Sequence, residues 1–244
     1  MATFLLVHGA WHGGWCFDAL AAELVRRGHR AIAPDLPGMG GDTTPRTDVT
    51  LAGWGTFIAD MARAQNEKVI LLGHSRGGIV ISEAAERAPD AIAALVYLSA
   101  FLVPSGRSMN DLVTQAPRSD IFDNGLSLHA DGASLVLDAQ AAVPVFYHLC
   151  DAAAAARAAA RLVPEPLAPL STPLQLSEEC YGRVPRHYIE CAQDQAIPLS
   201  QQREMQRALP CVSSVTLESD HSPFIGCPGR VADALGDIAS RYRI

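Results

Sequence analysis

The sequence is almost devoid of lysine and carries an excess of acidic residues. Lysine and arginine together number 19 against 26 aspartates and glutamates, so the formal net charge is −7. Nucleic-acid binding depends on clustered basic side chains that neutralise phosphates, so this balance argues against a nucleic-acid partner. Long apolar runs are also missing. No run approaches the roughly 20 residues needed to span a bilayer, so we expect no membrane partner.

Paired cysteines and a basic leader are absent as well. The six cysteines form no C-x-x-C pair and have no histidine at zinc-finger spacing, so we expect neither a metal site nor a disulfide framework. Residues 1–9 are apolar, but they lack basic residues and run into a glycine-rich turn, unlike a signal peptide. We interpret them as a first strand and expect a cytoplasmic protein.

Apolar segments of strand length alternate with helical ones through most of the chain. Hydrophobic residues make up 49% of the sequence, enough to build one large core. Alternation of this kind predicts an α/β fold, a mostly parallel sheet flanked by helices. The predicted strands are 4–7, 31–33, 69–72, 94–98, 187–192 and 214–217, and the predicted helices are 17–27, 50–64, 77–87, 200–208 and 229–241.

The alternation lapses between residues 101 and 185. This stretch is rich in proline and alanine and has a helical patch at 151–162. We interpret residues 101–185 as an inserted helical cap, and residues 1–100 together with 186–244 as the core.

Ser75 lies at the centre of a G-x-S-x-G pattern, in Gly73-His74-Ser75-Arg76-Gly77. The pattern alone also fits an ordinary turn, but here it directly follows a predicted strand and directly precedes a predicted helix. That context is typical of a nucleophile elbow, in which the glycines allow a sharp turn that exposes the serine. The sequence therefore predicts Ser75 as the nucleophile.

A serine nucleophile needs a base and a carboxylate that orients the base. His221 follows the last predicted strand and is the predicted base, whereas His8, His12 and His74 are expected to bond loop backbone. Asp194 follows the strand before and is the predicted carboxylate. Asp220 is the alternative, although neighbours on an extended segment point apart.

The position after the strand that ends at Leu98 is another place where an acid can stand, and it holds Ser99 and Ala100. The absence of an acid there favours Asp194. An oxyanion hole would be formed by the main-chain N–H groups of Arg76 and of Ala10, the latter in the turn His8-Gly9-Ala10, which is otherwise an ordinary tight turn.

With these motifs in hand, and with the run from His8 to Trp15, the chain resembles the hydroxynitrile lyase and plant methylesterase branch of the α/β-hydrolase superfamily, together with small bacterial esterases. The resemblance extends over nearly the whole chain and is weakest in the cap. It implies an α/β-hydrolase fold and an enzyme that needs no cofactor. Some bacterial relatives cleave pyrethroid esters.

The resemblance also separates two reaction classes. Hydroxynitrile lyases of this branch have a threonine right after the first histidine of the turn and a lysine right after the catalytic histidine. The corresponding residues here are Gly9 and Ser222. Cyanohydrin cleavage is therefore disfavoured, and a serine carboxylesterase acting through an acyl-enzyme is the leading interpretation. The alternatives are a hydroxynitrile lyase or another lyase on the same triad, and a ligand receptor on a hydrolase fold.

Aromatic side chains are candidates to line an apolar substrate pocket, although each of them is as well explained by packing of the cap. We expect a small to medium, largely apolar ester, with Arg76 as a basic side chain near the pocket mouth. Oligomeric state stays open, and a homodimer is one option. The pocket candidates are Trp11, Phe122, Phe146 and Tyr147, with Leu102 and Leu149 as aliphatic ones.

Overall fold

Six parallel strands form the central sheet in a computed structural model that describes residues 1–114 and 119–242. Each predicted strand is found within two residues of its predicted ends, so the predicted parallel sheet is confirmed. The sheet order is β2-β1-β3-β4-β8-β9. The strands are β1 (Thr3–Val7), β2 (Arg30–Ile32), β3 (Val69–His74), β4 (Ile92–Leu98), β8 (Arg186–Cys191) and β9 (Ser213–Leu217).

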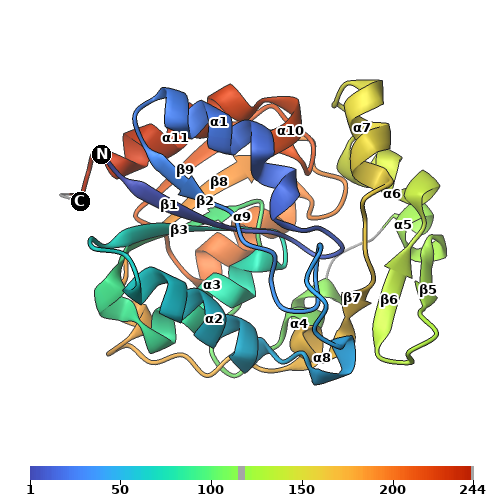
Figure 1. The fold of residues 1–244 in the computed structure, drawn as a ribbon, viewed down its shortest axis with the longest axis horizontal. Coiled ribbons are helices and arrows are strands. Elements are labelled where there is room, and N and C mark those ends of the chain that lie inside the picture. Colours follow the sequence, from blue (N-terminus) through green and yellow to red (C-terminus); the bar gives the residue numbers. More distant parts are fainter. Residues whose placement is uncertain (115–118, 243–244) are drawn as a thin grey trace.

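Helices cover both faces of this sheet (Figure 1). Alternate side chains of β1 enter two apolar clusters: Phe4 and Leu6 pack toward α1 and α11, and Leu5 and Val7 toward α2 and α3. Burial on both faces explains why the strands are apolar throughout. The helices of the core are α1 (Asp18–Arg26), α2 (Leu51–Arg63), α3 (Gly77–Arg87), α9 (Leu199–Ala208), α10 (Pro223–Gly226) and α11 (Pro228–Ala239), with 3-10 turns at Gly14–Phe17, Arg46–Asp48, Pro89–Ala91 and Tyr181–Arg183.

The inserted region contains the predicted helices and, in addition, a three-stranded antiparallel sheet that the sequence pattern does not predict. Its strands are two to four residues long, too short to show a period. The elements are α4 (Met109–Val113), α5 (Asp120–Asn124), β5 (Leu126–Leu128), β6 (Ser134–Leu137), α6 (Ala139–Phe146), α7 (Ala152–Ala159), β7 (Glu165–Pro166) and α8 (Leu167–Ser171).

Both ends of the inserted region pack into the core, through Leu102 near its start and Leu174 near its end. The domain boundaries at residues 101 and 185 therefore stay a prediction. From here on, "cap" means the part from α5 to β7, which lies at the end of the molecule opposite the two termini (Figure 1). Within the described residues, no helix has the length and apolar character needed to cross a membrane.

The order of the strands determines where a site can form. The chain passes from β1 to β2 on one side and then places β3 on the other side of β1, which creates a topological switch point between β1 and β3. Ligands of open α/β sheets bind at the carboxyl ends of the strands at such a point. Here those ends face the cap (Figure 1).

Candidate active site

Ser75 occupies the sharp turn between β3 and α3. Its φ is +52°, in the left-handed region that non-glycine residues rarely adopt. The glycines around it permit the turn: a Cβ on Gly73 would lie 2.6 Å from the Gly77 carbonyl oxygen, and one on Gly77 would lie 2.5 Å from the Val7 carbonyl oxygen. Strain of this kind is common at functional sites, and it turns the serine toward a cavity at the sheet edge.

His221 and Asp194 form a buried hydrogen-bonded pair. The Nδ1 atom of His221 donates to Oδ2 of Asp194 at 2.6 Å. The other carboxylate oxygen accepts the backbone N–H groups of Ala196 and Ile197 at 2.7 and 2.8 Å. Because Nδ1 carries the proton, Nε2 is free to act as a base.

Ser75 and His221 lie on the wall of the same cavity. His221 is therefore hydrogen-bonded to Asp194, whereas Ser75 and His221 share the cavity that their side chains face. Contacts between a nucleophile and its base are often loose before substrate binds.

Ser99 contributes to the carboxylate in a way that the sequence analysis did not predict. Its hydroxyl donates to Oδ2 of Asp194. Ser99 also has a positive φ, of 37°. It stands at the alternative acid position after β4, so the signal that could have identified it was present in the sequence. The position after β4 therefore holds no acid, but it holds a hydrogen-bond donor to Asp194.

Three buried histidines bond the loop backbone, as expected from their places in the turns. His8 donates to the Gly9 carbonyl at 2.9 Å and His12 to the Ala10 carbonyl at 2.6 Å. The His74 Nε2 donates to the His221 carbonyl at 2.8 Å, which fixes the backbone of His221. Burial lowers the pKa of His12 to about 4, and it lowers the pKa of His8 and His74 well below their usual range.

Asp220, the alternative carboxylate, is engaged elsewhere. Its Oδ2 accepts the N–H of Leu149 at 2.8 Å and its Oδ1 accepts the N–H of Ser222 at 3.0 Å. Because Leu149 belongs to the cap and Ser222 to the loop after β9, this carboxylate links the cap to the loop that carries His221.

Ala10 and Arg76, the predicted oxyanion-hole residues, line the same cavity as Ser75. The expectation that the Arg76 side chain lies near the pocket mouth is wrong. Its guanidinium is fully buried, donates to Glu165 at 2.9 Å and lies 4.2 Å from the ring centroid of Trp54. Glu165 belongs to β7, part of the small sheet that the sequence pattern did not predict.

The cavity wall toward the cap is apolar. The structure places Trp11, Phe122 and Phe146 on it, together with Leu126 and Leu135. The Phe146 ring lies 5.2 Å from that of His221, so a cap side chain packs directly on the predicted base. Two polar side chains that the sequence analysis missed, Asn110 and Gln201, also reach this cavity.

The other pocket candidates lie away from the wall. Tyr147 is buried, and its hydroxyl donates to Nε2 of His12 at 2.6 Å. Leu102 packs in the core cluster, and Leu149 is 47% exposed. Aromatic character alone therefore did not separate residues of the wall from residues behind it.

The two positions that would mark a lyase are small and uncharged in this chain. A Cβ on Gly9 would lie 2.8 Å from Nδ1 of His74 and 3.0 Å from Cβ of Ser75. Ser222 is fully buried. The residues that the structure describes also contain no cluster of three or more histidine, cysteine, aspartate or glutamate side chains arranged to hold a metal ion.

Comparisons with known proteins agree with this geometry. The model of the alpha/beta hydrolase family matches residues 4–234. A pyrethroid hydrolase of Sphingobium wenxiniae is 34% identical over 98% of this chain and 88% of its own. Methylesterase 1 of Arabidopsis thaliana is 30% identical over 98% of this chain and 96% of its own.

A solved structure gives the same result. The crystal structure of a pyrethroid hydrolase from Sphingobium faniae matches 99% of both chains with a TM-score of 0.85 and 29% identity. The chain therefore belongs to the alpha/beta hydrolase family, in the branch of the methylesterases and pyrethroid hydrolases, and is a serine hydrolase of the carboxylesterase type.

Proposed function

We propose that this protein hydrolyses a small to medium, largely apolar carboxylic ester through an acyl-enzyme on Ser75. His221 removes the Ser75 proton as the hydroxyl attacks the ester carbonyl, and Asp194 stabilises the imidazolium that forms. His221 then gives that proton to the departing alcohol. In the second half, His221 deprotonates a water molecule as it attacks the acyl group, and then gives that proton to the Ser75 oxygen as the acyl bond breaks, which releases the acid and free Ser75.

The observation that carries this proposal is the 2.6 Å bond between His221 and Asp194, on a cavity wall shared with the strained Ser75. The oxyanion would be held by the main-chain N–H groups of Ala10 and Arg76.

The nature of the cavity supports an apolar ester. Most of its wall comes from aromatic and aliphatic side chains, and the guanidinium of Arg76 is already paired with Glu165. A substrate carboxylate would find no unpaired cation among the described residues that line this cavity. Relatives named as pyrethroid hydrolase and methylesterase are consistent with this substrate class. A cytoplasmic location and a homodimer stay predictions.

The test is hydrolysis of p-nitrophenyl esters from acetate to octanoate, run beside mandelonitrile, with wild type and Ser75→Ala. We expect saturable ester turnover that falls by about 10⁴-fold or more in the variant. Ser82→Ala is a matched control, because it removes a buried hydroxyl from α3 that bonds Tyr97 at 2.7 Å, away from the cavity. Full turnover by Ser75→Ala, or cyanide release without ester turnover, would contradict the proposal.

A further inference from the structure

A buried ion pair joins the nucleophile elbow to the cap. Arg76 donates from Nε to Oε1 of Glu165 at 2.9 Å and from Nη2 to Oε2 at 3.4 Å. Both side chains have no exposed surface. Burial raises the pKa of the Glu165 carboxyl, and the Arg76 charge opposes that rise. A buried pair is seldom more stabilising than well-packed apolar residues, so its presence calls for a role other than stability.

The pair makes hydrogen bonds to the backbone on both sides of Ala10. The Nη2 atom of Arg76 donates to the Gly9 carbonyl at 3.0 Å. On the other side, Oε2 of Glu165 accepts the N–H of Trp11 at 3.0 Å. Trp11 has a φ of 60°, an unfavourable conformation for an aromatic residue that this bond helps to hold.

These contacts, together with the His8 bond to the same Gly9 carbonyl at 2.9 Å, hold the peptide that carries the Ala10 N–H. The carbonyl and the N–H of a trans peptide point in opposite directions, and the described residues contain no cis peptide bond. With the Gly9 carbonyl held toward Arg76, the Ala10 N–H of the same peptide points away from Arg76. A charged donor on the carbonyl also polarises the peptide and makes its N–H a stronger donor.

We propose that Arg76 and Glu165 are a positioning pair that aims the Ala10 N–H at the oxyanion of the tetrahedral intermediate. The proposal rests on the proposed esterase function. Arg76 then acts twice: its main-chain N–H is one donor of the oxyanion hole, and its side chain orients the other. Both side chains act through the backbone from Gly9 to Trp11, so they are positioning residues.

If the Arg76–Glu165 pair were purely structural, its only role would be to attach the cap to the core. The two roles differ in what they change. Loss of a contact that only attaches the cap lowers the stability of the protein. Loss of the orientation of the Ala10 N–H weakens binding of the tetrahedral species more than binding of the planar ester, and so lowers kcat with little change in KM.

The experiment compares Glu165→Gln, Arg76→Lys and the double variant Arg76→Met/Glu165→Leu with wild type on p-nitrophenyl butyrate. The double variant leaves no unpaired buried charge, so it should fold even if a single variant does not. We expect kcat to fall about 10- to 100-fold in Glu165→Gln and in the double variant, near the range for loss of one oxyanion donor. KM should stay within about threefold, and Arg76→Lys, which keeps the charge, should lose less.

A transition-state analogue supplies the second readout. An alkyl trifluoromethyl ketone forms a tetrahedral adduct with an active serine, so its affinity should fall by the same factor as kcat/KM. The matched control is Glu190→Gln, which removes a 5% exposed carboxylate that pairs with Arg203 at 3.1 Å away from the cavity. It should lower the melting temperature and leave kcat unchanged.

The outcomes separate this proposal from the proposed function. A folded double variant with wild-type kcat and wild-type affinity for the ketone would overturn the positioning role. If a p-nitrophenyl phosphonate did not label wild-type Ser75, the esterase function itself would be overturned. If the phosphonate labelled wild-type Ser75 and the variants kept wild-type kcat, only the positioning role of Arg76 and Glu165 would be overturned.

Discussion

The two walls of the cavity are built on different principles. The core wall carries Ser75 and His221, and the His221–Asp194 pair is held by hydrogen bonds from several elements. Asp194, for example, accepts two backbone N–H groups, the Ser99 hydroxyl and His221. On the cap wall, the side chains of Trp11, Phe122 and Phe146 are apolar and pack on one another, and the Trp11 ring N–H donates to the Leu135 carbonyl at 3.0 Å. Chemistry needs dipoles fixed in direction, whereas selection of an apolar substrate needs only shape.

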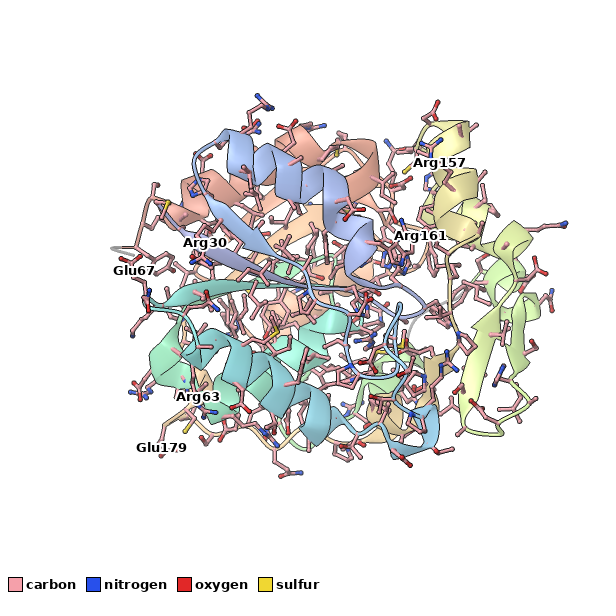
Figure 2. All side chains as sticks on the ribbon, viewed as in Figure 1. Arg30, Arg63, Glu67, Arg157, Arg161 and Glu179 are labelled. Atoms are coloured by element: carbon pink, nitrogen blue, oxygen red, sulfur yellow. The ribbon has the colours of Figure 1, made fainter. Side chains whose placement is uncertain are left out.

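The cap is nevertheless tied to the core close to the chemistry. Glu165 bonds the backbone of Trp11, Tyr147 bonds His12, and Asp220 bonds the backbone of Leu149. Figure 2 shows Arg161 at the end of α7, where its guanidinium lies 4.4 Å from the ring centroid of Trp15 in the core. A change in the cap can therefore reach the core wall through a few polar contacts.

The largest expected effect concerns the core side of the site, where variants of Asp194 and Asp220 show which carboxylate orients His221. Asp194→Asn should lower kcat by about 10⁴-fold, because an amide that donates to Nδ1 stabilises the wrong tautomer of His221. Asp220→Asn should lower kcat less than about 10-fold and should reduce thermal stability, because Asp220 fastens Leu149. Ester kinetics and thermal melts of both variants decide the question.

The opposite ranking of these two variants would move the orienting carboxylate to Asp220. Equal, small losses in both would mean that neither carboxylate orients His221.

A second test uses the buried histidines, of which His12 and His74 line the cavity. Their pKa in the unfolded chain is about 6.5, and burial lowers the pKa of His12 to about 4. The unfolded chain therefore binds more protons between these values, so stability is fully present above pH 6.5 and is lost as the pH falls toward 4. For His12 the loss at pH 5 is about 2 kcal/mol.

Urea unfolding at pH 7 and pH 5 measures this loss. His12→Gln keeps a donor for the Ala10 carbonyl and an acceptor for Tyr147, so the variant should lose less stability on acidification by about 2 kcal/mol. His148→Gln replaces an exposed histidine and serves as the control. An unchanged pH dependence in His12→Gln would show that the buried imidazole is not the group that titrates.

The cap wall is tested through substrate choice. Phe122→Ala should open the wall and raise kcat/KM for p-nitrophenyl octanoate relative to the acetate by about 10-fold, in the range for a few methylenes in an apolar pocket. Leu128→Ala is the control, because Leu128 belongs to the cap but is 62% exposed. The chain-length profile measures both. If Phe122→Ala lowered kcat equally for every ester, Phe122 would act on the chemistry and the two walls would not be separable.

Sequence patterns predicted the core because its signals are local. Strands such as β4 are continuous apolar runs, and the elbow glycines stand within two residues of Ser75. The predicted helical cap was incomplete, because β5 and β7 are too short to show a period. The Arg76–Glu165 pair joins residues 89 positions apart, and nothing local to either residue indicates its partner. The partner of Tyr147 was hidden for the same reason, at a separation of 135 residues.

Gly9 also limits what evolution or an engineer can do with this scaffold. The threonine of the lyases that the sequence resembles would need room at this position, and the room is taken by the ring of His74 and the Cβ of Ser75. His74 in turn holds the backbone of His221. A route from this protein to cyanohydrin cleavage must therefore change His74 before or together with Gly9, so no single substitution at Gly9 starts it without loss of the existing activity.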